Sequence, residues 1–401
     1  MKNMSEPLYL TAREAARELS VTPATLYAYV SRGLVRSEPL PDSRARRYRA
    51  EDVRALKNRR APLAVGGRGG DSDSPVLESS VSTLTEAGPL YRGVHAVQLA
   101  QDATLEQAAT LLWDVDGADP FAPDNLPVMS QAMRAVAAAA ADQPPLARAI
   151  AVLALSGHAD PKAFNRSPEG RARIAARAMR LVAASILGTE PAALPLHRQV
   201  ASKWASGNPT AEGLLRRAMV LLADHELNAS TYTVRCAAST GTNLYDQAIA
   251  GMAALKGPRH GGAGLLAKRL VAELAASDLT EAIAEKVALG ERIPGFGHPV
   301  YQSGDPRADD LLGALVEAGA DRRLAVDAPA AITEATGLHP NIDYAVAVMT
   351  HTLGLPAGAE ISLFAIARTA GWMAHGMEQM QSGTLIRPRA RYTGPAPARN
   401  G

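Results

Sequence analysis

Runs of alanine and leucine recur along this chain, and residues 135–142, AVAAAAAD, are the plainest example. Alanine and leucine are strong helix formers, whereas strands favour β-branched and aromatic side chains. Apolar residues make up 47% of the 401 residues, but aromatic residues make up only 4%. This pattern predicts many packed helices rather than a large sheet, and the length is enough for roughly two or three domains.

Several kinds of protein are disfavoured by features that the sequence lacks. No apolar run reaches the ~18 residues that a membrane-spanning helix needs, and no basic-then-apolar leader opens the chain, so we expect no membrane association. Cys236 is the only cysteine, which predicts no internal disulfide and a cytoplasmic location. His225 and Glu226 could open a zinc-binding helix, but alanine occupies position 229, where the second ligand is needed. We therefore expect no metal site.

Charge is distributed unevenly between the start of the chain and the rest. Residues 1–60 hold 13 Lys and Arg against 7 Asp and Glu, a net charge of +6, whereas the remainder holds 29 against 33. A basic head on a mildly acidic body indicates two roles, one of them on a polyanion. Residues 61–84 include a stretch rich in Gly, Ser, Asp and Pro and are expected to form a flexible linker between the two parts.

The pattern of the head predicts two short helices joined by a turn. Thr11 and Glu14 can form a capping box, so a helix should begin directly after Thr11. Thr22 is placed to cap a second helix, which Gly33 should end. Residues 36–60 then predict a proline-bounded hairpin and a short basic helix. This order of elements is typical of a winged helix-turn-helix domain.

The body carries two histidines in loops that glycine and proline keep from being helical. Residues 294–307, PGFGHPVYQSGDPR, place His298 among glycines and prolines, and His260 lies between Gly-Pro and Gly-Gly pairs. Asp343 opens an apolar helix, and Arg368 lies inside another, where a lone cation needs an anionic partner. Together they indicate a site for an anionic substrate and acid–base chemistry. From the residues alone, a surface turn at His298 and a helix-dipole role for Asp343 remain alternatives.

The head resembles the winged helix-turn-helix of the MerR family. The resemblance covers about 50 residues, assigns residues 1–60 to this domain and rests on the wing-to-helix junction RRYRAEDV at 46–53. The long dimerisation helix of that family does not follow, so a dimer has to come from the body. A small protein-interaction module is the alternative to a DNA-binding domain. The resemblance implies binding to duplex DNA through Thr22, Thr25 and Tyr27 on the recognition helix and Arg44, Arg46, Arg47 and Arg49 on the wing.

Five ordered motifs in the body are similar to those of the citrate synthase family. They are HELNAST at 225–231, the stretch 238–263 that ends GPRHGGA, PGFGHPVY at 294–301, PNIDYA at 340–345, and the segment 370–394 that ends IRPRARYTG. The resemblance spans about 85–394 and implies an all-α homodimer. Residues 85–260 and 348–394 are then the large helical domain, and residues 261–347 are the small domain that closes over the ligands.

The same resemblance implies the reaction and the roles of its residues. The reaction is the condensation of acetyl-CoA or propionyl-CoA with oxaloacetate, which gives citrate or 2-methylcitrate and CoA without a further cofactor. His298 is expected to polarise the ketone of oxaloacetate, Asp343 to take a proton from the acyl-CoA, and His260 to donate to the thioester oxygen. The residues expected to bind oxaloacetate are His225, Arg307, Arg368 and, from the other subunit, Arg387.

Two positions depart from the pattern of the family. Pro299 and Gln302 stand where many members carry basic residues that favour the phosphates of CoA. Acyl-CoA should then bind more weakly, or through Arg259, Lys256 or Arg292. The intact set of catalytic residues favours an enzyme, whereas the head and the altered CoA positions favour a DNA-binding regulator whose body senses a metabolite. Cleavage of citryl-CoA is a third possibility.

Overall fold

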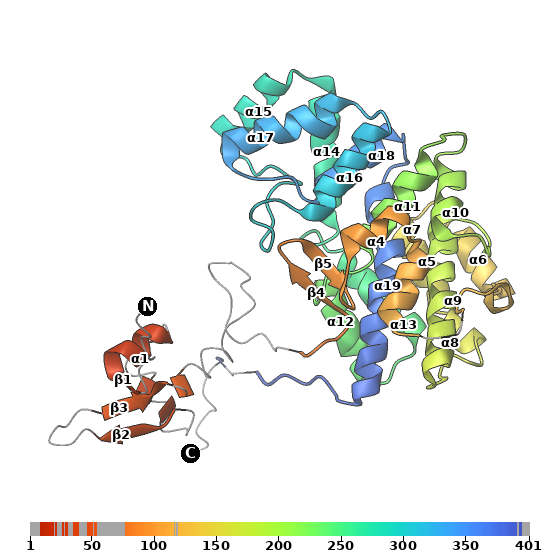
Figure 1. The fold of residues 1–401 in the computed structure, drawn as a ribbon. Coiled ribbons are helices and arrows are strands. Elements are labelled where there is room, and N and C mark those ends of the chain that lie inside the picture. The colour runs from red at the N-terminus through yellow and green to blue at the C-terminus, as the bar shows by residue number, and fades with distance from the viewer. Residues whose placement is uncertain are drawn as a thin grey trace, which may run out of the picture. The chain divides into compact units, whose positions relative to one another are not determined.

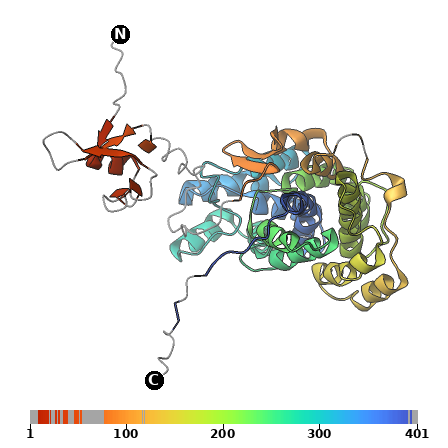
Figure 2. The same cartoon turned by 90° about the horizontal axis from the view of Figure 1, so that it is seen from below.

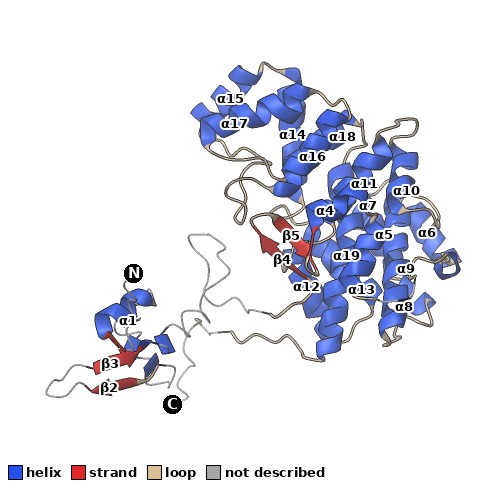
Figure 3. Cartoon of the chain, in the orientation of Figure 1, coloured by secondary structure: helices blue, strands red, loops and turns tan. Residues whose placement is uncertain are grey.

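Two compact units, Met1–Gly70 and Asp71–Gly401, make up the chain (Figure 1). The computed structural model describes residues 9–19, 21, 26–27, 29–30, 35–39, 46–50, 52–53, 77–115, 117, 119–390 and 393–394. Helices dominate the second unit, and Figure 3 shows strands only in the first unit and at the start of the second. The expectation of a mostly helical body that follows a small winged head in the sequence is confirmed.

The first unit contains a three-stranded antiparallel sheet and a capped helix. The strands β1 (Tyr9–Thr11), β2 (Ser37–Pro39) and β3 (Arg46–Arg49) lie in the order β1-β3-β2, and α1 spans Ala12–Glu18. The Thr11 hydroxyl accepts a hydrogen bond from the Glu14 amide, and the Glu14 carboxylate accepts one from the Thr11 amide. The predicted capping box and wing hairpin are therefore confirmed.

A small apolar core holds this unit together. Leu26 and Tyr48 are almost fully buried and pack with Ala15, Ala16 and other apolar residues of the unit. The predicted second helix is seen at 26–27 and 29–30, whereas Thr22, Thr25, Gly33 and Arg44 lie outside the described residues. Tyr27 of this helix is 54% exposed, which leaves its side chain accessible to a partner.

The second unit opens with a short antiparallel sheet and continues as a helical array. Its strands are β4 (Ser82–Thr85), β5 (Gly88–Tyr91) and β6 (Val94–His95), in that order. The helices before the His260 turn are α4 (Ala96–Asp102), α5 (Leu105–Trp113), η1 (Pro123–Asn125), α6 (Gln131–Ala139), α7 (Pro145–Leu153), α8 (Ser156–Ala159), α9 (Pro168–Leu187), α10 (Leu196–Trp204), α11 (Ala211–Leu222), α12 (Ala229–Ser239) and α13 (Leu244–Leu255). The strand β4 begins at Ser82, inside residues 61–84, the range that the sequence assigned to a linker, and ends at Thr85.

A second group of helices follows the turn that carries His260. Its members are α14 (Gly262–Ala276), α15 (Leu279–Ala288), α16 (Pro306–Glu317), the π-helical turn η2 (Arg323–Asp327), α17 (Ala328–Thr336) and α18 (Ile342–Thr352). Figure 1 shows α14 to α18 together at one end of the unit. Their range is close to that of the small domain expected over 261–347, and the domain boundaries themselves stay a prediction.

The last helix, α19 (Ala359–Ser382), is the central element of the second unit. It packs against α5, α9, α11, α12 and α13 as well as α14 and α18. Figure 2 looks along α19 and shows the other helices around it. Its side chains are therefore mostly buried, and its almost fully enclosed polar side chains include Arg368 and His375. Among the described residues, no helix has the length and apolar character needed to cross a membrane.

Candidate active site

Six of the seven expected catalytic and substrate-binding residues line one cavity of about 440 Å³. The six are His225, His260, His298, Arg307, Asp343 and Arg368. They come from the segment between α11 and α12, the turn after α13, the loop before α16, and the helices α16, α18 and α19. The seventh, Arg387, is exposed beyond the end of α19 and does not line this cavity. Leu84 of β4 and the exposed Arg259 complete part of the wall.

The loop that carries His298 is tied to the segment that carries Asp343. The Gly297 amide donates to the His339 carbonyl at 2.8 Å, and the Asn341 amide donates to the Gly295 carbonyl at 2.8 Å. Gly295 has a φ of +81°, and a Cβ there would lie 2.9 Å from the Cβ of Tyr344. Only glycine fits this close approach without strain. The glycines of the loop thus bring His298 and Asp343 to the same cavity.

Backbone contacts fix the proton of the His298 ring. Nδ1 accepts hydrogen bonds from the amides of Val300 at 3.1 Å and Tyr301 at 3.3 Å. A neutral imidazole that accepts at Nδ1 carries its proton on Nε2. Burial lowers the pKa of His298 to about 4, and the nearby Arg307 cation acts in the same direction. At neutral pH, His298 is therefore an uncharged ring with an Nε2–H donor.

Asp343 lies in the first turn of α18, where its backbone is capped. The Asn341 side chain accepts from the Asp343 amide at 3.0 Å, and Asp305 accepts from the Ile342 amide at 3.0 Å. Burial raises the pKa of Asp343 to about 6, although the Arg307 cation opposes this shift. A carboxylate with a raised pKa is a stronger base that is still ionised at neutral pH. Asp343 is thus suited to removing a proton from a bound ligand.

His260 is held by a hydroxyl at the start of α12. Its Nε2 lies 2.9 Å from Ser230 Oγ, which also accepts from Trp372 Nε1–H at 3.1 Å. Burial lowers the pKa of His260 to about 4, with a further contribution from the Arg368 cation. Like His298, this ring is uncharged at neutral pH. An uncharged histidine can donate a hydrogen bond through its single ring N–H.

Two of the arginines that line the cavity, Arg307 and Arg368, are buried and fixed by partners of their own. Arg307 is 2% exposed, and its Nε and one terminal nitrogen form a bidentate pair with Asp305 at 3.0 and 2.8 Å. Arg368 is also 2% exposed, and its Nε donates to the Leu222 carbonyl at 2.8 Å. The remaining donors of both guanidinium groups are available to an anion in the cavity, since planar guanidinium forks match carboxylates well.

His225 joins the two sides of the site. Its Nε2 lies 3.2 Å from the Tyr301 hydroxyl, and its ring meets the edge of the His298 ring with 5.3 Å between the centroids. Burial holds the pKa of His225 well below its usual value, and the cations of Arg307 and Arg368 act in the same direction. Three neutral histidines and two buried arginines therefore surround the cavity, which suits a small anionic ligand.

Several residues of the site were not recognised in the sequence. Asp305, Ser230 and Tyr301 position Arg307, His260 and His298, respectively. Asp305 was predictable, because an Asp before Pro at a helix start is a common N-cap whose carboxylate can reach the next turn. Ser230 carried no local signal, since its partner His260 lies 30 residues away in the chain, and the contact of Tyr301 with His225 spans 76 residues. In the described part of the chain, no cluster of three or more His, Cys, Asp and Glu side chains could hold a metal ion.

Comparison with known proteins agrees with this geometry. Residues 70–389 match the family model "Citrate synthase, C-terminal domain". The chain belongs to the citrate synthase family. "Citrate synthase 2" of Bacillus subtilis is 30% identical over 351 residues, which cover 79% of this chain and 93% of that protein. The "2-methylcitrate synthase" of Shewanella oneidensis is 35% identical over 188 residues, 45% of this chain and 50% of that protein.

Solved structures of citrate synthases share the fold. The enzyme from Pyrobaculum aerophilum superposes with a TM-score of 0.70 and 25% identity over 82% of this chain and 92% of that one. The enzyme from Thermotoga maritima gives a TM-score of 0.67 and 26% identity over 81% and 95%. The chain is therefore an enzyme of the citrate synthase type, a transferase.

The head has a match of its own. Residues 10–66 match the family model "MerR HTH family regulatory protein". Of the expected DNA contacts, Tyr27 is exposed on the second helix, and Arg46, Arg47 and Arg49 lie on β3. Neighbours hold these arginines in place: Arg46 donates to Ser37, and Glu38 pairs with Arg47 at 3.1 Å and with Arg49 at 3.7 Å. These contacts keep the three arginines on one wing.

Proposed function

We propose that the body condenses an acyl-CoA with oxaloacetate to give citrate, or 2-methylcitrate, and free CoA. The observation that carries this proposal is the convergence of His260, His298 and Asp343 on one cavity that also holds Arg307 and Arg368. Carbon–carbon bond formation from a thioester needs a base, donors for two oxygens, and cations for the carboxylates of the acceptor. The cavity offers all of these groups.

Oxaloacetate is the ligand that the buried cations fit. It carries two carboxylates and a ketone, so the free donors of Arg307 and Arg368 can each bind a carboxylate, with His225 beside them. The Nε2–H of His298 then donates to the ketone oxygen. This bond draws electrons away from the ketone carbon and makes it a better target for a carbon nucleophile.

Asp343 and His260 generate that nucleophile. The Asp343 carboxylate takes a proton from the carbon next to the thioester, and the C–H electrons move to the thioester oxygen as an enol or enolate forms. The Ser230 hydroxyl donates to Asn228 Oδ1 at 2.8 Å in this structure and also lies 2.9 Å from His260 Nε2. In the proposed reaction the hydroxyl turns its proton to His260 Nε2, while Asn228 Oδ1 keeps the amides of Ser230 and Thr231. The proton of His260 is then on Nδ1, from which it donates to the thioester oxygen.

The new carbon–carbon bond joins the enol carbon to the ketone carbon and leaves a citryl thioester. Water then hydrolyses this thioester and releases CoA as its thiol. Arg259, exposed on the cavity wall, is the basic residue placed to meet the acyl-CoA, whereas Lys256 and Arg292 do not line this cavity. We therefore propose that Arg259 takes over the contact with CoA that basic residues at positions 299 and 302 make in other members of the family.

A thiol-release assay tests the proposal and its alternatives. Purified protein is mixed with oxaloacetate and either acetyl-CoA or propionyl-CoA, and free thiol is followed; the faster substrate identifies the acyl group. The same protein is then given citryl-CoA, because cleavage forms oxaloacetate and acetyl-CoA without free thiol, whereas hydrolysis forms citrate and free CoA. No thiol release with either acyl-CoA, together with tight binding of oxaloacetate, would favour a metabolite sensor over an enzyme.

We further propose that the active form is a homodimer in which Arg387 completes the site of the partner subunit. The support is that Arg387 is exposed beyond α19 and does not line the cavity of its own chain. Arg387→Ala and Asp343→Asn chains should each be inactive, but mixed dimers should recover activity at about one quarter of all sites, because half of random dimers are mixed and each has one intact site. No recovery on mixing would contradict this arrangement.

A second function, binding of duplex DNA by the head, is favoured by the MerR match at residues 10–66 and by the basic residues of the wing. We propose that Thr22, Thr25 and Tyr27 face the bases and that Arg44, Arg46, Arg47 and Arg49 meet phosphates. Fluorescence anisotropy with labelled duplex fragments at low salt tests this. No binding by the full-length protein would make the head a protein-interaction module.

A further inference from the structure

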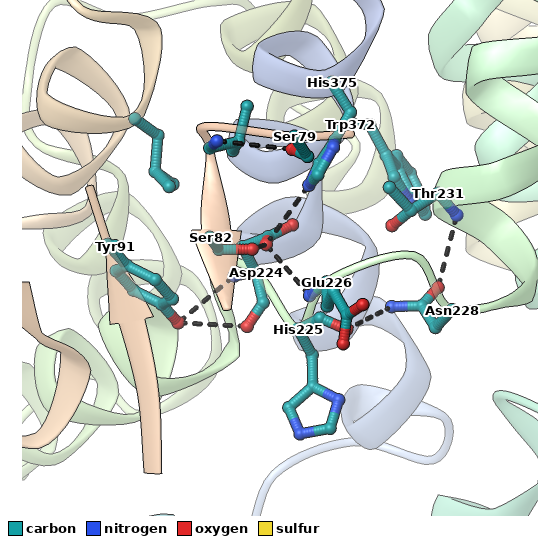
Figure 4. Close-up of polar contacts among 12 residues, drawn as sticks. Ser79, Ser82, Tyr91, Asp224, His225, Glu226, Asn228, Thr231, Trp372 and His375 are labelled. Carbon is teal, nitrogen blue, oxygen red and sulfur yellow. Dashed lines mark hydrogen bonds and ion pairs between the residues drawn. The ribbon is translucent and has the colours of Figure 1, made fainter. Parts of the chain in front are cut away.

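Beyond the residues that face the ligand, a buried carboxylate stands directly behind the cavity. Asp224 follows the end of α11, precedes His225 and is fully buried. Three groups meet its Oδ2: the Ser82 hydroxyl, the Glu226 amide at 3.1 Å and His375 Nε2 at 3.3 Å (Figure 4). Burial opposes its ionisation, but His375 and Arg368 outweigh this effect, so the pKa of Asp224 lies below its ordinary value. The carboxylate is thus charged, although Asp224 is not among the residues that line the cavity.

The bond from Asp224 to Glu226 closes a turn around His225. Because the side chain accepts the amide two residues ahead, His225 is the central residue of an Asx turn. Glu226 adopts a φ of +53°, which a residue other than glycine rarely adopts. In Figure 4, the ring of His225 points away from the Asp224 cluster. The side chain of Asp224 therefore sets the direction in which His225 leaves the backbone.

The backbone on the other side of this turn is also fixed. The Tyr91 hydroxyl accepts the Asp224 amide at 3.2 Å and lies 3.1 Å from the Asp224 carbonyl, and the Gly371 amide donates to Ala223 at 3.1 Å. A Cβ at Gly371 would overlap Asp224 Oδ1, so α19 can approach the carboxylate only with glycine at this position. These contacts hold the backbone at Ala223 and Asp224, so the side-chain contacts of Asp224 decide how the following turn is arranged.

Ser82 links this turn to the wall of the cavity. It lies on β4, two residues before Leu84, which lines the cavity itself. In the described part of the chain, Asp224 Oδ1 and His375 Nδ1 are buried without a hydrogen-bond partner. The other oxygen of Asp224, Oδ2, receives Ser82 and His375 as well as the Glu226 amide that closes the turn around His225.

We propose that Asp224, with Ser82 and His375, is a positioning residue that holds His225 in place for the 2-oxo dicarboxylate, but not for the acyl-CoA. This inference rests on the proposed function, because oxaloacetate is taken as the ligand beside His225. Asp224 carries out no chemical step. Its loss should weaken binding of oxaloacetate and leave the acyl-CoA side, formed by His260 and its neighbours, almost unchanged.

Two substitutions with matched controls test this role. Asp224→Asn keeps the size of the side chain but removes its charge, and Ser82→Ala removes one donor. Loss of the Ser82 hydrogen bond gives the Asp224 carboxylate, and with it His225, more freedom before the ligand binds, so Ser82→Ala should weaken oxaloacetate binding by up to about tenfold. Ser82→Thr restores a hydroxyl and should recover most of the affinity. Ser79→Ala is the control, because the Ser79 hydroxyl accepts the Val81 amide rather than reaching Asp224.

Calorimetric titration with oxaloacetate, the KM of each substrate and thermal unfolding are measured for every variant. We expect the Kd and KM of oxaloacetate to rise in Asp224→Asn and Ser82→Ala, with the KM of acyl-CoA within about twofold of wild type. Equal changes in both KM values that follow the loss of thermal stability would overturn the proposal, and so would unchanged oxaloacetate binding. If Asp224→Asn does not fold, the comparison of Ser82→Ala with Ser82→Thr tests the proposal instead. Failure of the wild type to bind oxaloacetate would instead refute the proposed function.

Discussion

Arginine side chains are presented in two contrasting ways in the cavity of the body and on the wing of the head. In the cavity, Arg307 is buried and its guanidinium is locked to Asp305 through two hydrogen bonds. On the wing, the side chains of Arg47 and Arg49 are 40% and 38% exposed and share Glu38. A buried guanidinium group in a fixed orientation suits one small ligand of defined shape. Exposed, loosely paired cations suit a polyanion that presents many similar phosphates.

The ion pairs of these arginines differ in how readily the arginine can leave its carboxylate for a ligand. Exposed ion pairs contribute little to stability, so Arg47 can leave Glu38 for a phosphate at small cost. The buried Arg307–Asp305 pair cannot open in this way, because breaking it would leave a charge without a partner inside the protein. The body should therefore depend on the geometry of its arginines, and the head mainly on their charge.

The largest expected effect tests whether the geometry of the body serves catalysis. Asp343→Asn should reduce thiol release by about 10²–10⁴-fold, because an amide cannot accept the proton, and should leave oxaloacetate binding in place. Thiol release and calorimetry measure the two quantities. Asp102→Asn, an exposed change on α4, is the control. A wild-type rate in Asp343→Asn would refute the role of this residue.

Exchange of arginine for lysine compares the two regions directly. Arg307→Lys keeps the charge but loses the fork that pairs with Asp305, so oxaloacetate affinity should fall about 100-fold. Arg46→Lys should change affinity for duplex DNA by less than about threefold, because a phosphate accepts either cation. Calorimetry and fluorescence anisotropy provide the two values. Losses of similar size in both regions would remove the distinction.

Acid should affect the body but not the head. The pKa of Asp343 is raised to about 6 by burial, so the base becomes protonated as the pH falls through this value. We expect kcat/KM for condensation to fall about tenfold per pH unit below pH 6. DNA binding should stay level over the same range, because guanidinium groups do not titrate there. A condensation rate that stays constant from pH 8 to pH 5 would exclude Asp343 as the base.

Salt should affect the head but not the body. If Arg46 and Arg47 each neutralise a phosphate, the double variant Arg46→Gln/Arg47→Gln should reduce the slope of log affinity against log salt by about 1.8. Condensation should remain unchanged. Anisotropy titrations between low and physiological salt measure the slope, and Arg134→Gln, an exposed arginine of the body paired with Glu190, is the control. An unaltered slope would mean that these two arginines make no phosphate contacts.

The smallest effect concerns the acyl-CoA. Gln302 is exposed one residue after Tyr301, so Gln302→Lys adds a cation near the loop that carries His298. An exposed ion pair is worth up to about 1 kcal/mol, and the KM of acyl-CoA should fall about two- to fivefold. Gln302→Glu should have the opposite effect and serves as the matched control. Identical KM values for the three proteins would show that this position does not meet CoA.

Features with local causes could be predicted from the sequence. The capping box of Thr11 and Glu14, the helix start at Asp343 and the loop position of His298 depend on neighbours within a few residues, and the structure shows each of them. The roles of His260, His298 and Asp343 came from family resemblance, because no pattern of spacing states what a histidine binds. Their convergence on one cavity supports those roles.

Features that depend on tertiary contacts could not be predicted. Ser82 and Asp224 are 142 residues apart, and neither stands in an unusual sequence context. Trp372 reaches Ser230 across the same separation of 142 residues. Hydrogen bonds of this kind appear only after α19 and the first sheet have packed, so the positioning of the site is a property of the folded core rather than of any motif.

The placement of β4 limits how the two units can be separated. Ser80 donates to Glu378 on α19, Ser82 donates to Asp224, and Leu84 lines the cavity. A body expressed from residue 85 onward would therefore lack one wall of its own pocket and the donor behind His225, although it would retain every residue that faces the ligand in the proposed reaction. A truncated body that keeps its cavity intact has to begin no later than Ser79.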